Sequence, residues 1–192
     1  MIYLILGLVV FLGVHSVRMV NDDWRTRTRR RLGAGNWKGL YSLASLAGLA
    51  LVAWGFDAAR DQPLLLWSPP VAMRHVAAVL TLLAFVLLAA AYVPGNSIRA
   101  RLHHPMVLGV KVWALAHLLS NGMLVHVVLF GSFLIWAVLN FRVARRRDRA
   151  AGTVYPAGNL RATTLAVALG VLAWGIFAFG LHGLLIGIKP FG

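Results

Sequence analysis

The sequence predicts an all-α protein that crosses a membrane six times, and three observations support this fold class. The 192-residue chain is 60% hydrophobic with a mean hydropathy of +0.77, too apolar for a soluble domain of this size to cover its surface with polar groups. Its apolar residues form long runs separated by short polar or proline-containing breaks. Its basic residues collect in alternate breaks, which is typical of membrane-spanning bundles. We expect a single membrane domain over residues 1–192.

Each apolar run is near the ~20 residues that a helix needs to cross the hydrocarbon core of a bilayer. The runs are Tyr3–Val20, Gly39–Phe56, Val71–Val93, Met106–Leu119, Leu124–Phe141 and Thr163–Ile188. The fourth is short, so we expect it to extend into its flanks. The first has no basic segment before it and no small-x-small cleavage site, so we expect a retained helix rather than a signal peptide.

The breaks contain residues that end helices or begin them. Pro63, Pro69 and Pro70 separate the second and third runs, and Val93–Asn96 supplies turn residues after the third. Pro105 is placed where the first turn of a helix lacks an N–H partner in any case. These positions support the predicted boundaries.

Charge placement predicts the orientation of the chain. The breaks after the first, third and fifth runs, with Arg18 near the end of the first run and Lys111 just inside the fourth, hold 16 of the 19 Lys and Arg residues. By the positive-inside rule, these breaks face the cytoplasm and both termini lie on the non-cytoplasmic side. Attraction to anionic headgroups in the lipid bilayer accounts for the net charge of +14, and we expect no nucleic acid partner.

The residues that are absent exclude several kinds of chemistry. The chain has no Cys and no Glu, and its five acidic residues are all Asp. Disulfides, thiolate metal sites, HExxH metalloprotease helices and carboxylate-bridged di-iron bundles are therefore excluded. No Asp lies well inside a predicted span, which disfavours a carboxylate proton relay. Any redox or metal chemistry must depend on histidine.

Ionisable groups inside predicted spans are candidates for function because they are costly in a membrane. His117 is central and flanked by small residues, and it is the strongest candidate ligand. His15 and His182 stay open between iron ligands and hydrogen-bonded structural groups, whereas we expect His75 to be structural and His103 and His126, near helix ends, to be interfacial. Lys111, seven residues after His104 on nearly the same helix face, either extends to the interface or binds an anionic group such as a haem propionate.

Depth limits which imidazoles can share one iron. His117 lies 13 residues after His104, or about 20 Å along a helix, so these two cannot ligate the same iron. His117, His75, His126 and His182 fall in the outer half of the bundle, and His15 falls toward the cytoplasm. On depth alone, His117 pairs with His182 or His75.

The combined pattern of short motifs resembles the NnrU family of bacterial membrane proteins over nearly the whole chain. The matching segments are Phe11–Arg18, Trp37–Tyr41, Val93–Asn96, His104–Gly109, Trp113–Leu119, Asn121–Gly122 and Leu181–Gly187. The resemblance implies an inner-membrane accessory protein of denitrification, linked to nitrite and nitric oxide reduction and to the reductase machinery that performs them.

The NnrU family is in turn similar to zeta-carotene isomerase, a membrane enzyme that uses haem b for redox-controlled isomerisation. That similarity implies that His15 and His117 are the axial ligands of haem iron. His104, Lys111 and Asn121 are further candidates for contact with the cofactor, with His182 and His75 as alternative ligands. The chain departs from the isomerase at Ala114, where that enzyme has a Cys proposed as an alternative ligand, and at His103, which replaces an Arg. The ligand switch of the isomerase therefore cannot be transferred.

Two other functions stay open, and a third is disfavoured. The alternatives to the accessory role are a haem-dependent membrane isomerase and a structural partner subunit without a cofactor, so enzymatic activity is not decided by the sequence. His104-Pro105 at a helix start is also similar to the Arg-His-Pro motif of membrane methyltransferases that use S-adenosylmethionine. Those enzymes use a later Glu, and this chain has none.

Overall fold

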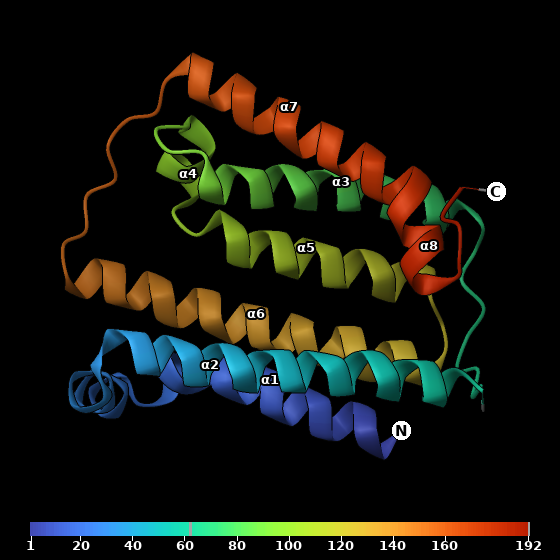
Figure 1. Cartoon of the computed structure of the whole chain (residues 1–192). Coiled ribbons are helices and arrows are strands. Elements are labelled where there is room, and N and C mark those ends of the chain that lie inside the picture. The colour runs from blue at the N-terminus through green and yellow to red at the C-terminus, as the bar shows by residue number, and fades with distance from the viewer. Residues whose placement is uncertain (62, 192) are drawn as a thin grey trace. The chain divides into compact units, whose positions relative to one another are not determined.

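The computed structural model describes residues 1–61 and 63–191, and within them it is an all-α protein, as predicted. The helices, shown in Figure 1, are α1 (Ile2–Val20), α2 (Asp22–Arg60), α3 (Ala72–Tyr92), α4 (Ser97–Leu102), α5 (Pro105–Ser120), α6 (Leu124–Ala150), α7 (Leu160–Ile176), the π-helical turn η1 (Phe177–Leu181) and α8 (His182–Ile186). In the described parts of the chain, β structure is confined to isolated bridges that pair Leu65 with Met123 and Asn96 with Asn159.

The lengths and hydropathies of the helices are those of a multi-pass membrane protein. In the described residues, five helices are long and apolar enough to cross a bilayer: α1, α2, α3, α6 and the continuous stretch Leu160–Ile186. The apolar helix α5 has 16 residues, about 24 Å at ~1.5 Å per residue, which is shorter than a ~30 Å hydrocarbon core. The sixth predicted span therefore stays a prediction.

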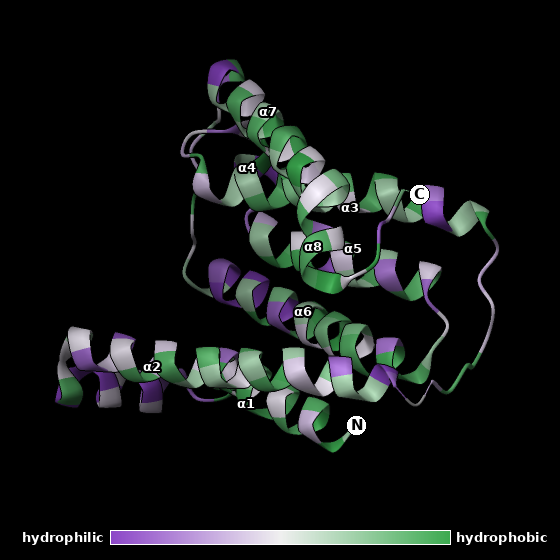
Figure 2. Cartoon of the chain, turned by 45° about the vertical axis from the view of Figure 1, so that its right-hand side comes forward, coloured by the Kyte–Doolittle hydropathy of each residue, from purple (hydrophilic) through white to green (hydrophobic). Residues whose placement is uncertain are grey.

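Several helix boundaries differ from the sequence prediction. The segment 21–38, predicted as a break, is mostly helical because α2 begins at Asp22, where the Asn21 side chain accepts a hydrogen bond from the Trp24 N–H. Gly33, with φ 78° and ψ 157°, interrupts this helix with a kink that only glycine adopts readily. Helix α6 continues past the predicted end at Phe141 to Ala150, because arginine favours helices even outside the apolar region. Figure 2 shows hydrophilic residues gathered in the last turns of α6.

The chain forms two compact units, and the first contains Met1–Trp67 and Gly122–Trp136. In this unit α1 packs along α2 with the two backbones in close contact. A Cβ atom added at Gly55 would lie 2.2 Å from the Leu4 nitrogen, and one added at Gly7 would lie 2.5 Å from the Val52 nitrogen. Glycines at helix crossings permit this approach in membrane proteins, where dispersion contacts replace the hydrophobic effect between helices.

The second unit contains Ser68–Asn121 and Ala137–Gly192, and α3 forms its centre by packing against both α5 and α7. Gly170 of α7 lies so close to α3 that an added Cβ would be 2.5 Å from the Val86 Cα. The Trp174 indole donates a 3.1 Å hydrogen bond to the Thr81 hydroxyl between the same two helices. These contacts fix the helices that carry His104, His117 and His182.

Candidate functional site

His15 lies on α1 in an aromatic environment within the first unit. Its ring stacks on Phe11 with 4.3 Å between centroids and meets the edges of Tyr41 at 5.3 Å and Trp136 at 6.2 Å. The Trp136 indole nitrogen is buried and has no hydrogen-bond partner among the described residues. A buried N–H donor without an acceptor is costly, so this donor is available to a carboxylate or carbonyl of a bound group.

A backbone hydrogen bond determines the orientation of the His15 ring. Nδ1 lies 2.7 Å from the Phe11 carbonyl oxygen, four residues earlier in the helix. A carbonyl oxygen can only accept, so Nδ1 carries the proton and Nε2 carries the lone pair of the neutral ring. This is the arrangement found for metal-binding histidines, in which the second ring nitrogen donates to a backbone carbonyl.

His117 on α5, in the second unit, has the same arrangement. Its Nδ1 donates a 2.9 Å hydrogen bond to the Trp113 carbonyl, so in the neutral ring the lone pair is on Nε2. The neighbouring Ala114 and Ala116 are fully buried, and their small side chains occupy little volume beside the ring. The Asn121 amide donates to the His117 carbonyl at 2.9 Å, which places Asn121 at the end of α5 as a helix-terminating residue.

The remaining predicted ligands have different surroundings. His75 is exposed near the start of α3. His182 follows the π-helical turn, and its Nδ1 donates a 2.6 Å hydrogen bond to the Ile188 carbonyl. Lys111 is half-buried in the middle of α5. Among residues 1–61 and 63–191, no three His or Asp side chains are grouped closely enough to hold a metal ion.

His126, predicted to be interfacial, is instead 8% exposed and lies between aromatic rings in the first unit. Its ring centroid is 5.5 Å from that of Phe56 and 6.1 Å from that of Phe130. Its Nδ1 has no hydrogen-bond partner in the described part of the chain. The sequence pattern gave no sign of this burial, because position 126 is near a helix end.

A second polar cluster, which we call the Asp148 cluster, joins His103, His104, Arg145, Asp148 and Tyr155 in the second unit. One carboxylate oxygen of Asp148 accepts a 2.7 Å hydrogen bond from His104 Nε2 and a 2.9 Å hydrogen bond from the Tyr155 hydroxyl. Arg145 donates to His103 Nδ1, and the His103 ring stacks on Tyr155 with 4.0 Å between centroids. The cluster ties the loop after α6 to the start of α5.

The backbone at the Asp148 cluster is strained. His103 has φ 68° and ψ −47°, and the His104 N–H donates to the Leu102 carbonyl at 2.8 Å. This is the rare form of the γ-turn, which costs free energy in a non-glycine residue. The ring contacts of His103 with Arg145 and Tyr155 stabilise it.

Sequence reasoning found His104 but missed the other members of the Asp148 cluster. One signal was present in the sequence: Asp148 is the only acidic residue after Asp61, and it stands within a run of five arginines. Burial raises the pKa of the Tyr155 hydroxyl above its ordinary value, and its hydrogen bond to Asp148 raises the pKa further. The Tyr155 hydroxyl therefore keeps its proton throughout the physiological pH range and donates the hydrogen bond to Asp148.

The fold defines a polytopic helical membrane protein, and its histidines are the candidate ligands. The family model described as NnrU protein matches residues 3–190. The chain therefore belongs to the NnrU family, as the motif pattern predicted. No curated protein and no solved structure matched it.

Proposed function

We propose that this chain is a haem-binding accessory protein of denitrification in the bacterial inner membrane, linked to nitrite and nitric oxide reduction. Membership of the NnrU family supports the role in denitrification. One observation carries the proposal of haem b: His15 and His117 each direct Nδ1–H to the carbonyl four residues earlier. With Nδ1 donating, Nε2 is the nitrogen that carries the lone pair of the neutral ring, which is the ligand form that a bis-histidine haem requires.

The residues around each histidine suit a haem in chemical type. His15 is enclosed by Phe11, Tyr41 and Trp136, and the buried indole N–H of Trp136 lacks an acceptor among the described residues. Ala114 and Ala116 provide small surfaces beside His117. Lys111 supplies a cation on the same helix. When bound, haem b would supply one-electron redox chemistry or a site for nitric oxide.

We further propose six spans with both termini on the non-cytoplasmic side, α5 being the short fourth span. Alternating loop charge supports this topology, since 16 of 19 basic residues lie in or beside the same three breaks. The Asp148 cluster and the arginine-rich end of α6 would then lie at the cytoplasmic surface.

A haem-dependent isomerase is the second candidate, supported by the similarity of the family to zeta-carotene isomerase. Ala114 supplies no iron ligand, so such an enzyme would have to work without a switch to a thiolate. The third candidate is a structural partner subunit in which the same histidines only pack and form hydrogen bonds.

The absorption spectrum of the purified full chain, expressed with ample haem, separates these candidates. The haem proposal expects a Soret band that is lost in His15→Ala and in His117→Ala. His75→Ala should keep the band, because His75 is exposed. Loss of the band in His182→Ala or His75→Ala but not in His15→Ala would replace the ligand pair. A colourless wild type would leave the partner subunit as the function.

A further inference from the structure

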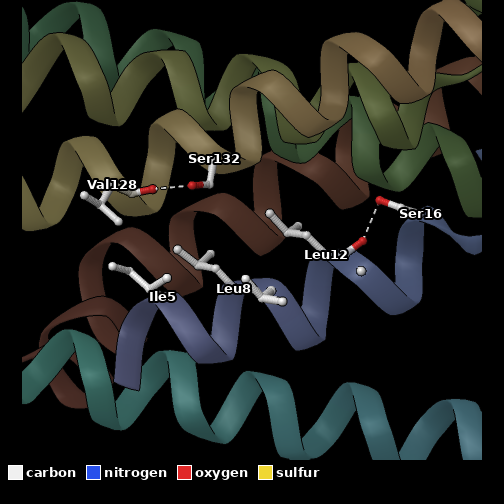
Figure 3. A pocket seen from close by; sticks show the side chains of 8 residues that line it. Ile5, Leu8, Leu12, Ser16, Val128 and Ser132 are labelled. Atoms are coloured by element: carbon white, nitrogen blue, oxygen red, sulfur yellow. Dashed lines mark hydrogen bonds between the residues drawn. The ribbon is translucent and has the colours of Figure 1, made fainter. Parts of the chain in front are cut away.

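A groove runs along the face of α1 within the first unit. One part, about 300 Å³ in volume, is shown in Figure 3, and its lining residues are Ile5, Leu8, Val9, Leu12, Gly13, Ser16, Val128 and Ser132. The adjoining part, about 320 Å³, shares Gly13 and Ser16 and continues past Val17 and Val20 to Trp24. From Ile5 to Val20 the groove follows about 22 Å of helix, which exceeds the ~15 Å depth of hydrocarbon in one leaflet.

The groove offers an apolar surface even where serine lines it. The Ser16 hydroxyl donates to the Leu12 carbonyl and the Ser132 hydroxyl donates to the Val128 carbonyl, each at 2.6 Å, as Figure 3 shows. Both hydroxyl protons are used inside their own helices, so neither is directed to an occupant. A hydrocarbon chain therefore suits this groove better than a polar ligand does.

The groove ends at a strongly cationic segment, Asp22–Leu32, which we call the basic arm. The arm contains five arginines, of which Arg27, Arg29, Arg30 and Arg31 are exposed. Its two acidic residues do not balance this charge, and Asp22 is already paired with Arg18 at 3.7 Å and Arg25 at 3.3 Å. The exposed arginines are thus available to an anion at the end of the groove.

The kink at Gly33 gives the basic arm its direction. In Figure 1 the arm is seen end-on and the rest of α2 is seen from the side, so the arm crosses the direction of the helix that follows it. Trp24 and Trp37 meet edge to face across the kink, with ring centroids 6.1 Å apart. Since α2 is a candidate span, the arm runs along the membrane surface, where tryptophan and arginine meet lipid headgroups.

We propose that the groove and the basic arm together bind one anionic phospholipid, with an acyl chain in the groove and the phosphate against the exposed arginines. Charge complementarity selects the headgroup, and the largely apolar lining from Ile5 to Trp24 selects the chain. The site consists of residues from the first unit alone and includes none of the candidate haem ligands, although His15 lies on the same helix.

Competition between two lipids tests the proposal on the purified, delipidated full chain. Native mass spectrometry measures the binding of phosphatidylglycerol and phosphatidylcholine with identical acyl chains. We expect phosphatidylglycerol to bind at least tenfold more tightly, since the basic arm that follows the groove carries four exposed arginines. Equal binding of the two lipids would overturn the proposal.

Filling the groove tests the position of the acyl chain. Gly13→Leu adds a side chain where nothing lies within 4 Å of the new Cβ, so the variant should fold. Gly175→Leu in α7 is the matched control, because its Cβ also meets nothing and it does not line the groove. We expect about tenfold weaker phosphatidylglycerol binding in Gly13→Leu alone. Unchanged binding in this variant would exclude the groove as the site.

Charge removal tests the headgroup site, and it keeps the proposal falsifiable if Gly13→Leu does not fold. R27Q/R29Q/R30Q should abolish the preference for phosphatidylglycerol while phosphatidylcholine binding is retained. R142Q/R146Q/R149Q removes the same charge from equally exposed positions of α6 and should keep the preference. An equal loss in both triple variants would reveal attraction by net charge and contradict a defined site.

Discussion

His104 Nε2 and Asp148 Oδ2 are 2.7 Å apart, although 44 residues separate them in the chain. Asp148 is the only carboxylate side chain of its unit, and it accepts from both His104 and Tyr155. The pair therefore ties the last turns of α6 to the start of α5, and Tyr155 joins the loop that follows α6 to the same carboxylate. It also directs the other ring nitrogen of His104, Nδ1, to carry the lone pair whenever the ring is neutral.

Asp148→Asn should loosen this attachment without removing the helices. The amide keeps the shape of the side chain but loses the charge that strengthens both hydrogen bonds, at a cost of about 1 to 3 kcal/mol. Thermal unfolding in detergent should show a lower midpoint, and trypsin should cut faster within Arg145–Arg149. Asp23→Asn is a suitable control, because Asp23 is exposed. Equal tryptic rates in wild type and Asp148→Asn would contradict the role given to Asp148.

The raised pKa of Tyr155 makes a prediction about alkaline pH. Burial, followed by the hydrogen bond to Asp148, raises this pKa above the ordinary 10.0, so the folded state favours the protonated phenol. A raised folded pKa contributes stability that is complete below pH 10 and is lost as pH rises through the folded value. The difference in unfolding midpoint between wild type and Tyr155→Phe should therefore be constant at neutral pH and shrink above pH 10. A difference that grows above pH 10 would mean that the pKa is lowered.

The strained turn at His103 predicts an unusual order of stability among its variants. Glycine adopts φ 68° without the clash of a Cβ atom, whereas alanine keeps the clash and loses the ring contacts. His103→Gly should therefore be more stable than His103→Ala by about 1 kcal/mol. This order is the reverse of the usual one, in which glycine is less stable than alanine. Thermal midpoints of the two variants in the same detergent measure this difference. The opposite order would show that the turn is not strained.

The apolar runs could be predicted from sequence because hydrophobic length alone identifies spans, and five of the six coincide with long apolar helices. The basic segment 21–38 was wrongly predicted as a break because hydrophobicity was used to find helices. This segment is highly charged, yet it forms a helix that is capped by Asn21. The Asp148 cluster was missed since its members come from three separate segments. Only the approach of α4, α6 and the following loop brings them together, and no local pattern encodes that approach.

The close packing of α1 on α2 predicts that any side chain added at Gly55 greatly lowers the free energy of unfolding. An added Cβ would lie 2.2 Å from the Leu4 nitrogen and 2.6 Å from the Tyr3 carbonyl carbon, so the backbone itself must move. Gly55→Ala should cost at least ~3 kcal/mol, at the upper end of the range for overpacking. Gly39→Ala is the control on the same helix, because its Cβ meets nothing within 4 Å and alanine favours the helix. The free energy of unfolding in mixed micelles measures both changes, and similar values would contradict the proposed crossing.

The proposed topology predicts where the two ends of the chain and the Asp148 cluster lie. Alkaline phosphatase is active only outside the cytoplasm, and a green fluorescent protein fusion folds only inside it. Fusion after Phe191 should give high phosphatase activity and no fluorescence, whereas truncation and fusion after Gly152 should give the reverse. The second result depends on α5 as a span. If only the five long helices crossed the membrane, with the first break still in the cytoplasm, residue 152 would lie outside the cytoplasm and residue 191 inside it.

Substituting Arg142, Arg145, Arg146, Arg147 and Arg149 with Gln should weaken the retention of the 152 fusion inside the cell, since these arginines form the charge bias of that loop. Phosphatase activity at both positions in the wild-type background would exclude the six-span arrangement.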